Sequence, residues 1–318
     1  MKVIVGIIAS KDPIYNLFKD IWIKCINYIK NQDKSTNYDF YFIYSEEIKS
    51  ESDNLYSLDI YKNYVDYYYK YKPFDTNNNN IKREVIVLNK IIDFYKYITI
   101  KLNLGNNDNY IYNTDNNTTY ILRTNLSSYF DFEMLYEYLL DKPKKNFFAG
   151  TINGYYNDIF TTMSGMNSIL SLDLIMYCVN NHINILDYLN ILKYEDDTIS
   201  NFIIKNLNVY LINIKRLDFI EMEKVILPTH VWPATPKSII YQKCKISDNS
   251  LFSFRFKTFN RINDIEIMNI LNDNINIIKK FNLNNFVDFM SKSYGYLINT
   301  ESQEYGDLYS EHPFKINI

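Results

Sequence analysis

Glycine is scarce in this chain, with only 7 residues among 318. These glycines are scattered, and neither a G-x-G-x-x-G motif nor a G-x-x-x-x-G-K-[ST] motif occurs. Such motifs bring backbone N–H groups close to a pyrophosphate or a triphosphate. The sequence therefore excludes a dinucleotide fingerprint and a P-loop, and the usual ATP and NAD sites lose their support.

Cysteine and histidine are equally scarce, with 3 residues of each type. They are isolated from one another, so no C-x-x-C, no H-E-x-x-H and no zinc-finger spacing is present. Structural zinc is therefore not expected. An odd number of isolated cysteines fits reduced thiols in a cytosol-like compartment.

The chain also lacks a basic excess and a long apolar run. It carries 34 basic and 37 acidic residues, a formal net charge of -3, which argues against a general nucleic-acid binder. The apolar run at residues 3–9 is far shorter than the roughly 20 residues of a membrane-spanning helix, and no cleavage site follows it. We expect a soluble, cytoplasmic protein.

Asparagine, isoleucine, lysine and tyrosine are abundant, and tyrosine alone occurs 31 times. This bias indicates AT-rich codons, so one residue of these types carries little information. Arginine occurs only five times and carries more. A composition of 47% hydrophobic and 22% charged residues is typical of a globular protein with a sizeable core.

Hydrophobic periodicity predicts an α/β fold with a mostly parallel central sheet flanked by helices. Residues 2–9 form an unbroken run rich in β-branched residues, typical of a strand buried on both faces. A helical stripe at residues 14–29 and a second buried run at 37–44 complete a βαβ unit. Later strands are expected at 120–123, 146–152 and 251–259, further helices at 84–100, 132–140, 169–180, 195–203 and 265–281, and a polar surface excursion at 50–80.

The chain shows no internal repeat and no clear linker. We expect a single domain, with a core at residues 1–210 and a C-terminal loop and helical extension at 211–318 that completes it. In open α/β sheets, ligands bind beyond the carboxyl ends of the strands. Ser10 after the first strand and residues 125–128 after the third are therefore the first places to look for a site.

Three clusters could carry chemistry, and each has an ordinary structural alternative. Residues 195–197 place three carboxylates together, as in a general-base site or an acidic first helical turn. Residues 254–257 with Arg261 alternate cations with aromatics, as in a diphosphate clamp or a solvated edge strand. Residues 123–128 form a polar turn at the end of a strand, which could be a ligand site or an ordinary βα loop.

The order of these segments resembles glycosyltransferases of the GT-A fold, in particular the group containing fringe and the β1,3-galactosyltransferases. That group has the pattern K-T-D-D-D-x-[FY]-[VF], whose place is taken here by residues 123–130 (RTNLSSYF). Residues 88–90 (LNK) resemble its N-L-x-x-K-T segment, and residues 164–173 its S-G-x-x-x-x-x-S-x-D segment. Residues 195–200 (EDDTIS) resemble [ED]-D-x-x-[IL]-G. With the codon bias, the chain is similar to enzymes of this kind encoded by AT-rich giant DNA viruses, and would then act in the host cytoplasm or the virion.

The resemblance implies an inverting transfer of a sugar from a nucleoside-diphosphate sugar, with a UDP-sugar favoured, to a hydroxyl group of a glycan or protein acceptor. It gives Asp196 the role of general base and Asp197 a supporting role. Ser164 and Gly165 fall on the acceptor side, and Gly165 would let a ligand approach the backbone closely. The donor-side candidates are Ser10, Lys90, Arg123, Asn125, Ser127, Arg255, Lys257 and Arg261.

One departure from the family concerns the metal. The family's Asp-x-Asp pair holds a divalent cation, whereas Asn125 and Ser127 stand at these positions here, and Phe254 stands where its late histidine is expected. Neutral side chains are poor ligands for such a cation. We therefore expect no required cofactor, disfavour Mn²⁺ or Mg²⁺, and assign neutralisation of the diphosphate to the arginines and lysines.

His230 and Trp232 lie in a proline-rich loop and could form an acceptor wall, or the tryptophan could pin the loop to the core. Two function classes are alternatives to a glycosyltransferase. An inactive carbohydrate- or protein-binding module is the main alternative, and a nucleotidyltransferase is disfavoured because it needs an acidic metal pair. A homodimer remains open, and neither a nucleic acid nor a membrane is expected as a partner.

Overall fold

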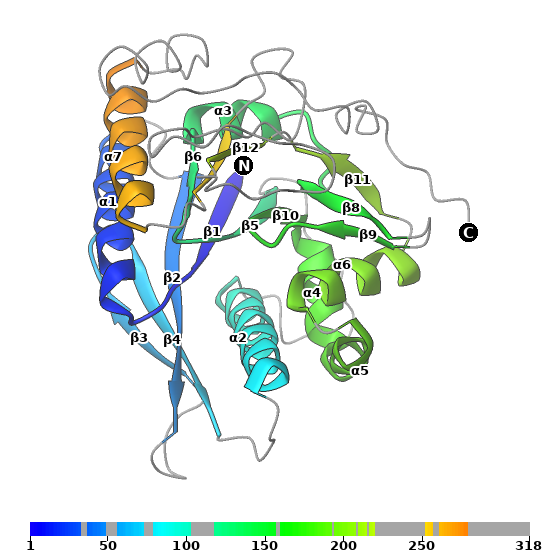
Figure 1. The fold of residues 1–318 in the computed structure, drawn as a ribbon. Coiled ribbons are helices and arrows are strands. Elements are labelled where there is room, and N and C mark those ends of the chain that lie inside the picture. Colours follow the sequence, from blue (N-terminus) through cyan, green and yellow to red (C-terminus); the bar gives the residue numbers. More distant parts are fainter. Residues whose placement is uncertain are drawn as a thin grey trace, which may run out of the picture.

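The computed structural model describes residues 1–32, 37–48, 56–72, 79–102, 118–156, 160–192, 194–207, 209–214, 216–219, 252–256 and 261–278. In this part of the chain, a central β-sheet is covered by helices on both faces (Figure 1). This arrangement confirms the expected α/β class. None of the helices in the described ranges is long and apolar enough to cross a membrane.

The central sheet has eight strands, six of which run in the same direction. The exceptions are β10, which is antiparallel to both of its neighbours, and the edge strand β3. In spatial order the strands are β11 (Tyr210–Asn213), β7 (Phe147–Gly150), β10 (Asn167–Ser171), β5 (Thr119–Asn125), β1 (Lys2–Ile8), β2 (Tyr38–Glu47), β4 (Val65–Tyr71) and β3 (Tyr56–Ile60).

Seven helices are described, and they divide between the two faces of the sheet. α1, α3 and α7 share one hydrophobic cluster, and α2, α4, α5 and α6 share the other. Figure 1 shows α7 lying beside α1, with α2, α4, α5 and α6 on the other side of the sheet. Their bounds are α1 (Pro13–Lys30), α2 (Asn79–Lys101), α3 (Phe132–Leu139), α4 (Leu172–Asn180), α5 (His182–Leu192), α6 (Glu195–Asn206) and α7 (Arg261–Ile278).

The first strand explains why the sheet has two cores. Successive side chains of a strand point to opposite faces, so Val3, Val5 and Ile7 pack with α1, whereas Ile4 packs with α2 and α4. Both sets are buried. An unbroken apolar run is therefore required here, which is what the sequence pattern predicted.

A smaller sheet extends the carboxyl end of β5. Its strands are β12 (Arg216–Phe219), β13 (Ser253–Phe256) and β6 (Ser128–Phe130). Because β6 follows β5 after a two-residue turn, this sheet brings residues from the last quarter of the chain to the end of a central strand. A separate hairpin joins β8 (Ile152–Tyr156) to β9 (Phe160–Met163).

The structure confirms the first βαβ unit but corrects two later expectations. The polar, tyrosine-rich segment 50–80 is not only a surface excursion, since its described part contributes β3 and β4 to the sheet. Tyr67 and Tyr69 of β4 pack in the cluster that contains α2, whereas Tyr68 stacks on Tyr44 of β2. Tyr67 is fully buried. The run at 169–180 is not one helix, because β10 occupies its start and α4 begins at Leu172. The domain boundary at residue 210 stays a prediction.

Candidate functional site

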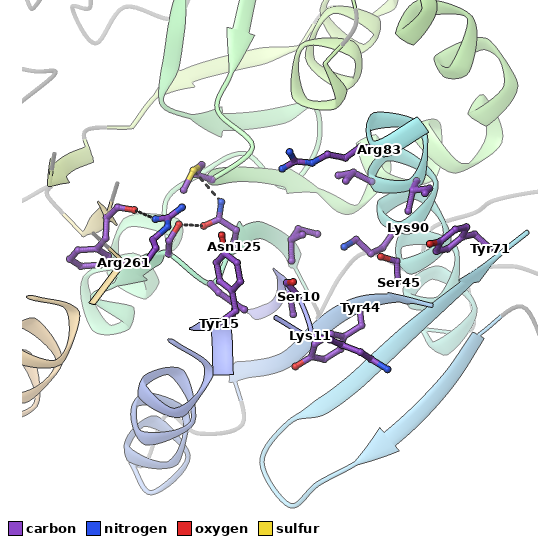
Figure 2. A pocket seen from close by; sticks show the side chains of 18 of the residues that line it. Ser10, Lys11, Tyr15, Tyr44, Ser45, Tyr71, Arg83, Lys90, Asn125 and Arg261 are labelled. Carbon is purple, nitrogen blue, oxygen red and sulfur yellow. Dashed lines mark hydrogen bonds between the residues drawn. The ribbon is translucent and has the colours of Figure 1, made fainter. Parts of the chain in front are cut away.

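A pocket of about 760 Å³ opens at the carboxyl ends of β1, β2 and β5, the edge at which ligands bind in open α/β sheets. One wall is formed by α2 and the other by the turn after β5 together with β13 and the start of α7. Figure 2 shows Arg83 and Lys90 reaching into the pocket from α2, opposite Asn125 and Arg261. The sequence therefore predicted the correct edge of the sheet.

The pocket lining is strongly cationic. Six lining side chains carry a positive charge, and none of the lining residues that the structure describes is Asp or Glu. This contrasts with a chain whose formal net charge is -3. Two of the six cations are paired with carboxylates outside the lining, Lys11 with Glu46 and Arg261 with Asp264. A concave surface lined by one sign of charge attracts the opposite sign, so the lining favours an anion. The six residues are Lys11, Lys82, Arg83, Lys90, Arg255 and Arg261.

The floor of the pocket is formed by Asn125 at the end of β5 and by the turn residues Leu126 and Ser127 that follow it. The Asn125 Oδ1 accepts hydrogen bonds from the hydroxyls of Ser127 and Ser128, at 3.1 and 3.2 Å. Trp22 of α1 donates its indole N–H to the Leu126 carbonyl at 3.1 Å. The turn is thus fixed from inside by neutral hydrogen bonds.

Arg255 and Arg261 come from different elements but meet at this turn. Phe256, next to Arg255 in β13, donates its backbone N–H to the Ser127 carbonyl at 2.8 Å. Arg261 opens α7, where its Nη1 donates to the Phe256 carbonyl at 3.2 Å and pairs with the buried Asp264 carboxylate at 2.7 Å. Both arginines line the pocket, as the sequence predicted, while Lys257 lies outside the described residues.

Lys90 is the most deeply buried of the six cations, with only 3% of its surface exposed. Burial and the neighbouring Arg123 guanidinium lower its pKa from 10.5 to about 8, against the opposing Glu195 carboxylate. Its ammonium group makes no hydrogen bond to another described residue. A buried ammonium group without a hydrogen-bonded carboxylate is costly unless a ligand compensates it.

Arg123 differs from its expected place. Its side chain does not line the large pocket but pairs with the buried Glu195 carboxylate at 2.6 Å. The guanidinium also lies against the Gly165 backbone, where any Cβ atom would be only 1.2 Å from its Nη1. Gly165 therefore makes room for Arg123, instead of for a ligand. Together with Asp196 these residues line a cavity of only about 10 Å³.

Asp196 follows Glu195 in the first turn of α6 and is half-buried. Its Oδ2 accepts the Gly165 backbone N–H at 3.2 Å, and its Oδ1 accepts the Asp197 backbone N–H at 3.1 Å. Gly165 is next to Met166, which lines the large pocket. Asp196 itself does not line the large pocket; the Gly165 N–H that orients it belongs to the residue before Met166, and Asp197 is half-buried beside it.

The remaining predicted residues fall into three groups. Ser10 lines the pocket, and its hydroxyl accepts the Asp12 backbone N–H at 3.2 Å. Ser164 is buried and accepts a hydrogen bond from Arg216 at 2.7 Å, so its hydroxyl is structural. His230 and Trp232 lie outside the described residues.

Sequence reasoning missed several pocket residues. Arg83 was noticed only as one of five arginines, although it lies on the same face of α2 as Val87 and Lys90. That helical spacing was a usable signal. The tyrosines of the lining carried no signal, since tyrosine is abundant everywhere in this chain. They are Tyr15, Tyr44 and Tyr71; the other aromatic residue, Phe256, belongs to the cluster at 254–257 that the sequence had indicated.

No group of three or more His, Cys, Asp or Glu side chains that could hold a metal ion occurs among the described residues. Asn125 and Ser127 hydrogen bond to one another, and Asn125 also donates to the Met166 sulfur at 3.1 Å. The side chains that would have to bind the metal are therefore neutral, and both already make hydrogen bonds within the protein. These residues do not fit a divalent cation that prefers carboxylates.

Comparison with known proteins gives a structural match of low similarity. No protein-family model matches the chain, and neither does any curated protein. Among solved structures, one match is "a glycosyltransferase involved in the glycosylation of the major capsid of PBCV-1". It is 11% identical, with a TM-score of 0.42, over 85% of this chain and 100% of that chain. The proposals below rest on the pocket and not on this match.

Proposed function

We propose that the chain is a glycosyltransferase that takes its sugar from a nucleoside-diphosphate sugar bound in the large pocket. The observation that carries this proposal is the lining at the carboxyl ends of the parallel strands, which has six cations and, among the residues that the structure describes, no carboxylate. A diphosphate carries the matching charge, and guanidinium groups bind phosphate oxygens in pairs. The volume of about 760 Å³ lies within the range of small-molecule sites.

The chemistry assigned to this site is a single displacement with inversion. The acceptor hydroxyl loses its proton to the Asp196 carboxylate as its oxygen bonds to the anomeric carbon. The bond from that carbon to the diphosphate breaks, and the leaving diphosphate takes the electron pair. Arg255 and Arg261 would stabilise the charge that develops on it, without the divalent cation that an Asp-x-Asp pair would hold.

Several parts of this proposal come from the resemblance and not from the pocket. They are the choice of a UDP-sugar, inversion, the place within the fringe and β1,3-galactosyltransferase group, and the glycan or protein acceptor. The pocket supports a diphosphate of any base. The orientation of Asp196 by the Gly165 N–H supports its role as base, because a base must be held in line with the attacking hydroxyl.

The test is hydrolysis and transfer with a panel of UDP-, GDP- and TDP-sugars, with Mn²⁺ and with EDTA. We expect one donor to be consumed in EDTA as well as in Mn²⁺. Asp196→Asn should lower turnover by about 10²–10⁴-fold while the melting temperature and nucleotide affinity stay close to those of the wild type.

Asp197→Asn is the comparison variant, since it changes the neighbouring carboxylate on the same helical turn, to which the resemblance gives only a supporting role. It should lower turnover less than Asp196→Asn does. Equal turnover in Asp196→Asn and the wild type would overturn the base assignment. Nucleotide binding without turnover of any donor would instead identify an inactive binding module, and strict dependence on Mn²⁺ would contradict the neutral role of Asn125 and Ser127.

A further inference from the structure

We propose that Lys90 is the proton-linked phosphate contact of this pocket, so that a nucleoside diphosphate binds its ammonium form and draws a proton from solvent under alkaline conditions. This inference rests on the nucleoside diphosphate assigned to the pocket under the proposed function. It does not rest on the transfer reaction.

The first argument is the position of Lys90. It lies on the face of α2 that forms one wall, and Figure 2 shows its amine pointing from the helix toward the pocket interior. The residue is 3% exposed, so its charge is held in a protein environment and not in bulk water. Among the described residues, no carboxylate hydrogen bonds to it, since the nearby Glu195 pairs with Arg123.

The second argument is the balance of charge around Lys90. Arg123 of β5 and Arg83 of α2 repel its ammonium group, and Glu195 of α6 is the single carboxylate that favours it. Glu195 is itself shared with Arg123 at 2.6 Å. Lys90, Arg123 and Arg83 thus lie around a buried carboxylate that Arg123 already occupies, with Glu84 and Asp196 next to it. An arriving diphosphate would add negative charge on the pocket side of Lys90.

These charges set the direction of the pH dependence. Lys90 has a pKa of about 8 in the free protein, lowered by burial first and by Arg123 second. A bound diphosphate would raise this value, so binding takes up a proton wherever free Lys90 is neutral. Affinity should be highest below pH 8 and should fall as the pH rises through that value, by about tenfold between pH 7 and pH 9.

Other titratable groups around the pocket are separable from Lys90. Burial raises the pKa of Glu195 from 4.5 to about 7, so this carboxylate is ionised near pH 8.5. Burial raises the pKa of Tyr44 well above its usual value of 10.0, which keeps that phenol neutral. The phosphate of a nucleoside diphosphate is also fully ionised there, since its second pKa is about 6. Lys11, Lys82, Arg255, Arg261, Tyr15 and Tyr71 complete the set of titratable side chains that line the pocket.

The experiment is calorimetric titration with UDP near pH 8.5 in two buffers of different ionisation enthalpy. The difference between the two measured binding enthalpies gives the number of protons taken up when UDP binds. We expect uptake of about 0.7 proton per UDP near pH 8.5. This pH is chosen because Glu195, with a pKa of about 7, is ionised there in the free protein. GDP and TDP serve in its place if they bind more tightly.

Lys90→Met should abolish the proton uptake. Lys90→Arg should bind UDP without proton uptake, because a guanidinium stays charged at every pH used. The matched control is Lys82→Met, a lysine on the same wall, which should weaken binding while the proton uptake remains. Melting temperatures verify that each variant is folded.

UDP binding with no proton uptake in the wild type, or with unchanged uptake in Lys90→Met, would overturn the inference and leave the proposed transfer intact. Proton-linked binding without turnover of any nucleotide sugar would support the inference on Lys90 and contradict the proposed transfer reaction. A chain that binds no nucleoside diphosphate would contradict both.

Discussion

At the scale of single residues, the contact between Gly165 and Arg123 is the tightest constraint near the candidate base. A Cβ atom at Gly165 would lie 1.2 Å from Nη1 of Arg123, so an alanine must displace the guanidinium and weaken its pair with Glu195. We expect Gly165→Ala to lower the free energy of unfolding by about 1–3 kcal/mol, the usual cost of overpacking. Urea denaturation measures it.

Gly150→Ala is the matched control for this prediction. A Cβ atom there meets the Asn167 carbonyl oxygen at 3.3 Å, the Ser168 Cα at 3.4 Å and the Met163 sulfur at 3.5 Å, so its cost should stay within about 1 kcal/mol. If Gly165→Ala were as stable as Gly150→Ala, the guanidinium would not lie where the structure places it.

The same residues show what a sequence alone can and cannot reveal. Arg123 is conspicuous because arginine is rare here, but the structure gives it a buried ion pair and no place in the large pocket, so its predicted donor contact stays a prediction. Its role could not be read, because the partner Glu195 lies 72 positions away along the chain. The sequence predicted close approach of a ligand at Gly165, whereas the group that needs its missing Cβ is the Arg123 guanidinium, which only the structure reveals.

At the scale of elements, α1 supports the floor of the pocket through one side chain. Trp22 is fully buried and donates its indole N–H to the Leu126 carbonyl, between Asn125 and Ser127. Trp22→Phe keeps an aromatic ring but leaves that carbonyl unsatisfied. We expect a loss of about 1–3 kcal/mol in unfolding free energy and a weaker affinity for UDP, measured by denaturation and calorimetry.

Phe18→Leu controls for packing alone, since Phe18 is a buried residue of the same helix with no bond to the turn. It should lower stability while UDP affinity is kept. Equal UDP affinity in Trp22→Phe and the wild type would show that the indole bond does not position the turn.

Elements with a simple hydrophobic period were predictable from the sequence, and those set by distant partners were not. The strand β1 and the helix α1 follow from their patterns because both faces of the strand and one face of the helix are apolar. The strands β3 and β4 were missed, since their tyrosines resembled surface composition until β2 paired with them. The strand β13 was predicted, but not its pairing with β6, which brings Arg255 to the pocket.

At the scale of the whole molecule, the main feature is the gathering of cations at one pocket. A chain of net charge -3 gathers six cations around a pocket whose described lining has no carboxylate. These cations come from the loop after β1, from α2, from β13 and from α7. Sequence neighbours alone could not reveal this cluster, because the sheet topology brings it together.

The most direct measurement of this central claim is calorimetric titration of the wild type, Arg255→Ala and Arg261→Ala with UDP near pH 7. Each variant should lose roughly 1.5–3 kcal/mol of binding free energy, the scale of a charged hydrogen bond. Lys24→Ala, which removes an exposed cation of α1 far from the lining, should bind as the wild type does. UDP affinity that is unchanged in both arginine variants would contradict the account of the pocket as a diphosphate site.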